Sequence, residues 1–198
     1  MPVGPLPDVR GVTHSANLGM NWNLLVTLVP GRGHESEVLG ALSRFGRFRR
    51  TGFRDVYLGY CGNVDALLDA IVHARLEERR WARHIGRVIP LEAVFSFAPE
   101  SLAARLEAAV APLAARMQSG SFHVRLERRG MEGEVATQEI ERILAEHVDA
   151  IATARGVVLR TDFSDPDYVV AVETVGNECG VALITRVLRE RYPFVRPR

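Results

Sequence analysis

The sequence contains no lysine: its 25 basic side chains other than histidine are all arginines, set against 24 carboxylates. A chain without lysine cannot supply the lysine of a phosphate-binding P-loop, of a Schiff-base enzyme or of a protein kinase, so those classes are excluded. Arginine itself is suited to phosphate, because its planar guanidinium donates two parallel hydrogen bonds to neighbouring oxygens.

Cysteine and long apolar runs are also scarce. Cys61 and Cys179 are the only two cysteines and stand far apart in the sequence, which is typical of a cytoplasmic protein with reduced thiols. No apolar run approaches the roughly 20 residues that a membrane-spanning helix needs, so we expect no membrane partner. Residues 1–20 lack the continuous apolar segment of a signal peptide, and we expect a flexible tail there.

The residue patterns of known catalytic and metal sites are missing as well. The six histidines are not spaced with cysteines or carboxylates as metal ligands are. There is no G-x-S-x-G motif, and no G-x-G-x-x-G motif after a strand. An acyl-CoA pyrophosphate loop would begin at Arg83 and fails at Val88, where a small residue is required. We therefore predict no catalytic residue, no metal, no cofactor and no enzymatic activity of its own.

The arginines are gathered in three places. The first cluster is opposed only by Asp55, and the second, near the C-terminus, only by Glu190. The third lies in a glycine-flanked loop before a helix predicted at Thr137, whose first N–H groups could add to anion binding. Its arginines could equally pair with Glu132 and Glu134, and the residues leave both readings open. The clusters are Arg44, Arg47, Arg49, Arg50 and Arg54; Arg186, Arg189, Arg191, Arg196 and Arg198; and Arg128 and Arg129.

Residues 21–98 predict a ferredoxin-like domain, because their apolar patterns give the order β-α-β-β-α-β. Asn63 is the predicted N-cap of the second helix. The buried face of that helix is predicted to be Val64, Leu67, Leu68, Ile71 and Leu76. The predicted strands are 23–29, 48–53, 55–60 and 88–97, and the first helix is 35–44.

Residues 99–198 predict a second domain. A helix begins at Pro99, an alternating strand covers 122–127, and a longer helix begins at Thr137 as its N-cap. Its predicted buried stripe is Ile140, Ile143, Leu144, Val148 and Ile151. A short strand at 157–160, a hairpin at 165–184, a short helix near 186–191 and an extended tail at 192–198 follow.

The hairpin is the centre of this second half. Its two runs are apolar on both faces, as in strands that are buried on both sides, and Gly176-Asn177 between them is a turn signal. We expect the other C-terminal elements to pack on it.

Four segments of residues 101–198 resemble the THUMP domain, specifically the stand-alone kind in the tRNA-acetylation adaptor family. They are FHVRLERRG, TQEIERILAE, DPDYVVAVETVGNECGVALI and RYPFVR, in that order. The resemblance implies an α+β or α/β chain in which a ferredoxin-like domain, here 21–98, precedes a THUMP domain, here 99–198.

The resemblance also implies a function. THUMP proteins grip the acceptor stem of tRNA and its single-stranded 3′ CCA end, and the adaptor family presents tRNA to a separate acetyltransferase that makes N4-acetylcytidine. The partners expected here are thus tRNA and an RNA acetyltransferase. The candidate RNA-binding residues are Arg125, Arg128, Arg129, Asn177, Arg186, Arg189, Arg191 and Arg196, extended from the N-terminal half by Arg47, Arg49 and Arg50.

Two alternatives stay open at this point. The chain could be an RNA-modifying enzyme in its own right, which product formation without a partner would reveal. It could also be a regulator that binds a small molecule through the ferredoxin-like half, which stabilisation by metabolites rather than by tRNA would reveal.

Overall fold

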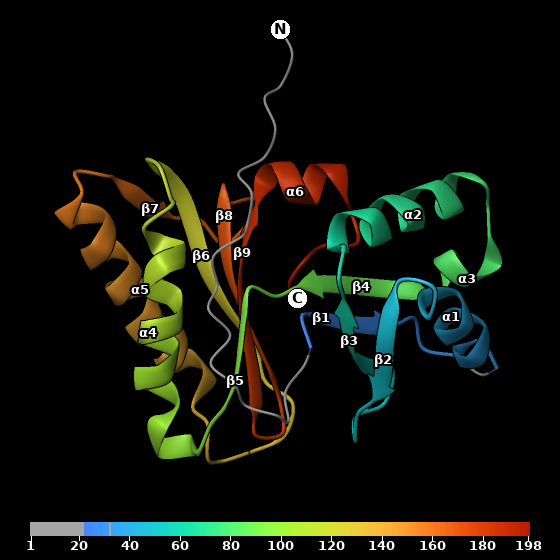
Figure 1. Ribbon diagram of the computed structural model, residues 1–198. Coiled ribbons are helices and arrows are strands. Elements are labelled where there is room, and N and C mark those ends of the chain that lie inside the picture. Colours follow the sequence, from blue (N-terminus) through green and yellow to red (C-terminus); the bar gives the residue numbers. More distant parts are fainter. Residues whose placement is uncertain (1–21, 32) are drawn as a thin grey trace, which may run out of the picture.

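The structure, a computed structural model, describes residues 22–31 and 33–198, which form two β-sheets side by side (Figure 1). The predicted flexible tail at residues 1–20 lies outside the described residues. Among the residues that are described, no helix is both long and apolar enough to cross a membrane.

The first sheet has four antiparallel strands in the order β2-β3-β1-β4. This order, with a helix after the first strand and helices after the third, is the ferredoxin-like arrangement that the sequence predicts. Its strands are β1 (Leu24–Leu28), β2 (Gly46–Arg50), β3 (Val56–Cys61) and β4 (Ile85–Pro90), and its helices are α1 (Glu35–Leu42), α2 (Val64–Leu76) and α3 (Arg80–Arg83).

Local chemistry explains where α2 begins. The Asn63 side chain accepts a hydrogen bond from the N–H of Ala66 at 3.0 Å, which confirms the predicted N-cap. Leu67, Leu68 and Ile71 are buried as predicted. Leu76 is 76% exposed, so its predicted place on the buried face is wrong. It is the last residue of the helix.

The second sheet has five strands in the order β5-β9-β8-β6-β7, with β6 parallel to both β7 and β8. Helices α4 and α5 cover its outer face (Figure 1). Its strands are β5 (Ala93–Ser96), β6 (Gly120–Glu127), β7 (Leu159–Thr161), β8 (Tyr168–Val175) and β9 (Glu178–Thr185); the helices of this half are η1 (Pro99–Ser101), α4 (Leu102–Ala114), α5 (Thr137–Ala154) and α6 (Arg186–Arg191).

The predicted strand at 88–97 is in fact two strands, β4 and β5, that belong to different sheets. The change of sheet takes two residues. The N–H of Leu91 donates to the carbonyl of Asn23 in the first half at 2.8 Å, and the N–H of Glu92 donates to Val181 of β9 at 2.9 Å. The sequence hides this step because apolar residues continue through it. The domain division at residues 98 and 99 stays a prediction.

Helix α5 corrects a second detail. The N-cap is Ala136, which makes no capping side-chain hydrogen bond, and Thr137 is the first helical residue. The predicted stripe is confirmed at Ile140, Leu144 and Val148, which are buried against the second sheet, whereas Ile143 and Ile151 are only partly buried.

The β8–β9 hairpin is buried on both faces, as predicted. Ala171 and Ile184 lie in the core shared with the first sheet, whereas Val172 and Val181 lie in the core under α4 and α5. Gly176 begins the turn with a φ of 59°, a left-handed conformation that glycine adopts without strain.

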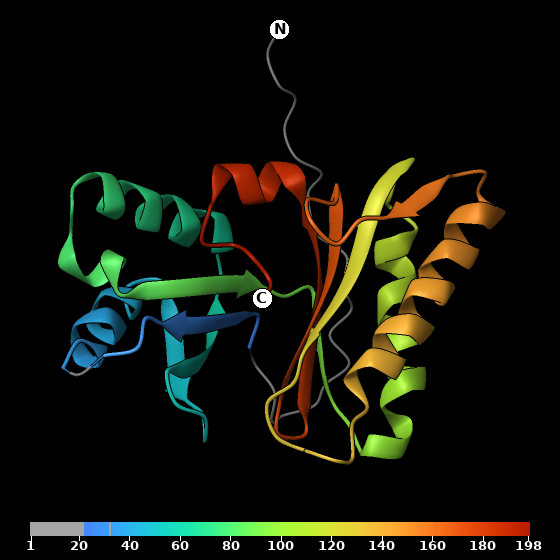
Figure 2. The ribbon, with the colours of Figure 1, turned by 180° about the vertical axis from the view of Figure 1, so that it is seen from behind.

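The C-terminal tail returns to the first half of the molecule. Tyr192, Phe194 and Val195 are buried in the core of the first sheet. The N–H of Val88 on β4 donates to the carbonyl of Phe194 at 3.0 Å, and the Tyr192 hydroxyl donates to Asp69 on α2 at 2.6 Å. The chain therefore ends between β4 and β6 (Figure 2).

Candidate nucleic-acid interface

A basic hollow of about 170 Å³ lies where β6, the loop before β8, α6 and the C-terminal tail meet. It contains three of the predicted RNA-binding arginines: Arg125 from β6, and Arg189 and Arg196 from the C-terminal cluster. We call this site the basic hollow. Its lining residues are His123, Arg125, Phe163, Ser164, Pro166, Val169, Arg189, Arg196, Pro197 and Arg198.

Strand periodicity places the cationic groups of β6. His123 and Arg125 alternate with buried residues, so both face the side of the sheet opposite α4 and α5. The Nε of Arg125 donates to the backbone oxygen of Arg198 at 2.5 Å, and its Nη1 lies 3.9 Å from Glu141. Arg198 in turn lies 3.5 Å from Glu127. These contacts hold the guanidinium of Arg125 at the wall of the basic hollow.

Two arginines of the basic hollow retain unused capacity for hydrogen bonds. Arg196 is exposed and makes no ion pair within residues 22–31 and 33–198. The Nε of Arg189 is buried and has no hydrogen-bond partner in the described part of the chain. A buried N–H without a partner is costly, but this one has no accessible surface, so the donors open to a ligand are those of the exposed Arg196.

The α6 arginines also brace the loop before β8. Arg186 pairs with Asp165 and, at 3.2 Å, with Asp167, and Arg189 lies 3.4 Å from Asp165. Asp167 further accepts hydrogen bonds from the backbone N–H and the hydroxyl of Ser121 at 2.8 and 2.9 Å. The N–H of Ser121, its hydroxyl and Arg186 together hold the pKa of the Asp167 carboxyl below its ordinary value. Arg186 is therefore a structural anchor of this loop.

An aromatic ring stands at the rim of the basic hollow. Phe163 is 76% exposed, and its ring meets the edge of His123 at a centroid distance of 4.9 Å and an angle of 75°. Burial lowers the pKa of His123, so its ring is neutral at neutral pH. The sequence prediction missed His123, Phe163 and Arg198 as members of the site. The outward position of His123 next to Arg125 on one strand face was the available signal.

The arginines of the loop after β6 lie at the other end of the hairpin. Arg129 is 9% exposed and donates to the buried Glu173 of β8 at 2.5 Å, with Glu127 at 3.7 Å. Burial raises the pKa of Glu173, and the positive charge of Arg129 opposes that shift. Arg128 donates to the carbonyl of Gly130 at 2.7 Å. The guanidinium of Arg129 is thus enclosed by the protein.

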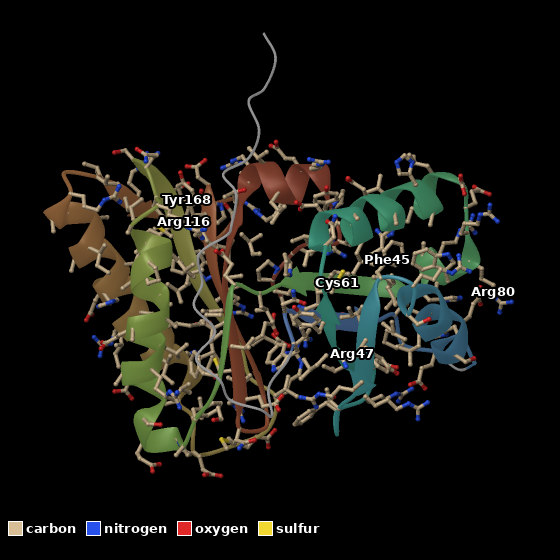
Figure 3. The ribbon with its side chains drawn as sticks, in the orientation of Figure 1. Phe45, Arg47, Cys61, Arg80, Arg116 and Tyr168 are labelled. Carbon is tan, nitrogen blue, oxygen red and sulfur yellow. The ribbon has the colours of Figure 1, made fainter. Side chains whose placement is uncertain are left out.

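The remaining predicted residues are dispersed. Asn177 is exposed in the hairpin turn, where its carbonyl accepts from the N–H of Phe97. Arg191 lies 3.0 Å from Asp69 on α2. On the β2 edge, Arg49 pairs with Glu178 and Arg50 with Glu35, while Arg47 is exposed (Figure 3). None of these five lines the basic hollow. Their contact with RNA stays a prediction.

Other site chemistry is sparse in the described residues. They contain no group of three histidine, cysteine or carboxylate side chains placed to hold a metal ion. Cys61 and Cys179 are both buried and are not joined to one another. Burial raises the pKa of both thiols, so neither forms a thiolate readily at neutral pH.

Comparison with solved structures shows a shared fold over about four fifths of the chain. PH1313 from Pyrococcus horikoshii Ot3 has a TM-score of 0.52 at 13% identity, over 82% of this chain and 55% of that one. TrmN from Thermus thermophilus has a TM-score of 0.54 at 19% identity, over 81% and 45%. A 4-thiouridine synthetase, solved as an RNA complex with bound ATP, has a TM-score of 0.55 at 15% identity, over 82% and 41%.

The chain spans about half the length of these structures. No curated protein sequence matches it. One family model does match, that of the THUMP domain, over residues 102–183, which run from the start of α4 to near the end of β9. This confirms the predicted THUMP domain, at residues 102–183, whereas the resemblance to the tRNA-acetylation adaptor family stays a prediction.

Proposed function

We propose that the protein binds tRNA at the basic hollow and presents it to a separate modification enzyme without catalysing the modification itself. The observation that carries this proposal is the convergence of Arg125, Arg189 and Arg196 beside an exposed aromatic ring. Guanidinium groups bind phosphate oxygens, and an exposed ring offers a face to an unpaired base.

The THUMP domain supports the choice of RNA over other polyanions. The basic hollow lies at the edge of that domain and takes residues from it and from the C-terminal tail. One structure that shares this fold, the 4-thiouridine synthetase, is an RNA complex. We extend that property to this chain as part of the proposal.

The finer parts of the proposal rest on the resemblance to the tRNA-acetylation adaptors. We propose that the ligand is the acceptor stem with its 3′ CCA end, and that the partner is an acetyltransferase that forms N4-acetylcytidine in the cytoplasm. The narrow size of the basic hollow supports a single-stranded end as the ligand, because a duplex presents its phosphates along a wide surface.

Binding of full-length tRNA and of tRNA trimmed of its CCA end, measured by fluorescence anisotropy at several salt concentrations, tests the RNA part. We expect tighter binding of full-length tRNA and a steep loss of affinity with salt, because phosphate contacts release counterions. Arg196→Ala should weaken binding about ten-fold, which corresponds to about 1.4 kcal/mol. The matched control is Arg142→Ala on α5, an exposed arginine outside the basic hollow.

Equal affinities for the two tRNAs would overturn the acceptor-end assignment. Equal effects of the two variants would overturn the basic hollow as the site.

The non-catalytic role has its own experiment. The purified protein is incubated with tRNA and acetyl-CoA, with and without a candidate acetyltransferase, and the nucleosides are analysed by mass spectrometry. We expect N4-acetylcytidine only when both proteins are present. Product formed by this protein alone would overturn the adaptor role and favour an RNA-modifying enzyme.

A further inference from the structure

A second, more open hollow of about 420 Å³ adjoins the basic hollow. Phe163 and Ser164 line both, so the exposed Phe163 ring stands between the two spaces. The second hollow is polar apart from that ring. It is lined by Ser121, Arg160, Thr161, Asp162, Phe163 and Ser164.

The Phe163 ring is held in place although it is exposed. The edge contact with His123 orients it from the side of β6. The loop behind it is fixed because the Asp162 carboxylate accepts from the N–H groups of Ser164 and Asp165 at 2.8 and 3.2 Å. Pro166, at the far end of the loop, is buried. An oriented aromatic face in water is suited to stacking, because little ordering remains to be done on binding.

Cationic groups lie on both sides of the ring. Arg125 and Arg196 line the basic hollow, and Arg160 lines the second hollow and is exposed. A nucleic-acid strand that crosses the ring would meet a guanidinium before and after the stacked base. The hydroxyl group of the exposed Thr161 adds hydrogen-bonding capacity. This polar lining favours a nucleotide over an apolar protein segment.

We propose that Phe163 is the stacking platform for an unpaired base, and that single-stranded RNA runs over it from the basic hollow into the second hollow. This inference rests on the proposed function, because it assumes that RNA is the ligand of the basic hollow. It adds Phe163 to the RNA-binding residues and gives the path of the strand. At least two consecutive unpaired nucleotides are bound, with backbone contacts at Arg196 on one side of the ring and at Arg160 on the other.

The experiment uses the full chain and two RNA hairpins of identical stem, one with a short unpaired 3′ tail and one blunt. A fluorescent adenine analogue in the tail reports stacking by quenching. Phe163→Ala should weaken binding of the tailed hairpin about ten-fold and abolish the quenching, because base–aromatic stacking contributes on that scale. Phe163→Trp should keep both. Binding of the blunt hairpin should not change.

Leu76→Ala is the matched control, because Leu76 is equally exposed at the end of α2 and lines neither hollow. It should bind both hairpins as the unchanged protein does. Phe163→Ala should also melt at the same temperature as the unchanged protein, because an exposed ring makes few contacts to lose.

Each outcome separates the inference from the proposed function. If the unchanged protein binds neither hairpin, the proposed function fails. If it binds the tailed hairpin and Phe163→Ala binds it equally well, the stacking inference alone fails. If Phe163→Ala weakens both hairpins equally, the ring does not discriminate an unpaired base, and the inference is again overturned.

Discussion

The two ends of the β8–β9 hairpin differ in what they do with arginine. At the end where β8 begins and β9 finishes, the guanidinium groups of Arg125, Arg189 and Arg196 converge on the basic hollow, and Arg196 is exposed. At the end with the turn, Arg129 is enclosed by its ion pair with the fully buried Glu173. Both ends look alike in the sequence, as short arginine-rich segments next to glycine or proline. Whether the arginines of such a segment are accessible to a ligand depends on their burial and on whether a buried carboxylate pairs with them.

The largest effect on stability is expected from the removal of Arg129 at the turn end. A small effect would contradict the difference between the two ends. Arg129→Ala leaves the Glu173 carboxylate buried without its closest cation, so the free energy of unfolding should fall by about 3–5 kcal/mol. Urea unfolding measures this. Arg142→Ala, which breaks an exposed pair with Glu146 on α5, should cost at most about 0.5 kcal/mol. Similar losses in both variants would show that the turn end is not a core.

For tRNA affinity, in contrast to stability, the larger effect is expected at the end of the hairpin that carries the basic hollow. Arg125→Ala should lower tRNA affinity about ten-fold and reduce the slope of affinity against salt by roughly one contact. Arg128→Ala, at the turn end, should lower it by less than about two-fold, because Arg128 does not line the basic hollow. Anisotropy titrations over a salt series compare the two. A larger effect at Arg128 would place the RNA at the turn end.

The carboxylate that braces the loop of the basic hollow should make the stability depend on acid. The pKa of Asp167 is lowered in the folded protein, so its contribution to stability is present above its ordinary value of 3.8 and is lost as the pH falls through the native pKa. Melting temperatures measured from about pH 6 to about pH 2 should therefore fall more steeply for the unchanged protein than for Asp167→Asn. Parallel curves would mean that Asp167 does not brace the loop of the basic hollow.

The smallest effect is expected at the β2 edge. Arg47 is exposed, so Arg47→Ala should change the free energy of unfolding by less than about 0.5 kcal/mol. Its effect on tRNA affinity should be smaller than that of Arg196→Ala, because it lies outside the basic hollow. An equal or larger loss of affinity would extend the RNA surface onto the first sheet.

The ferredoxin-like order and the buried hairpin could be predicted because both depend on local periodicity. Helix spacing, the Asn63 cap and the Gly176 turn each specify an element within a few residues. The step from β4 to β5 could not be predicted, because the apolar residues before Leu91 pack in the first core and apolar residues after it pack against the second core. The sequence shows only one continuous apolar run.

The candidate site was predictable in part. Arg125, Arg189 and Arg196 follow from the arginine clusters and the THUMP resemblance, and the structure brings these three together. Phe163 did not stand out, since one aromatic residue in a polar loop has no periodic pattern. The enclosure of Arg129 was also hidden, because Glu173 is 44 residues away in the sequence and only strand pairing aligns them.

Each half of the molecule is completed by a segment that is adjacent in sequence to the other half. Strand β5, which directly follows the first sheet in the sequence, pairs in the second sheet, and Phe194 of the C-terminal tail packs in the core of the first sheet. The halves are therefore interlocked rather than tethered. A hinge motion between them would have to withdraw Phe194 from under the guanidinium of Arg75, which lies 4.8 Å from its ring, and break the bond from Val88. Arg196 and Arg198 follow Phe194 closely in the sequence, so the packing of Phe194 fixes the orientation of the basic hollow relative to the first sheet. An RNA bound in the basic hollow would therefore be held at a constant angle to that sheet.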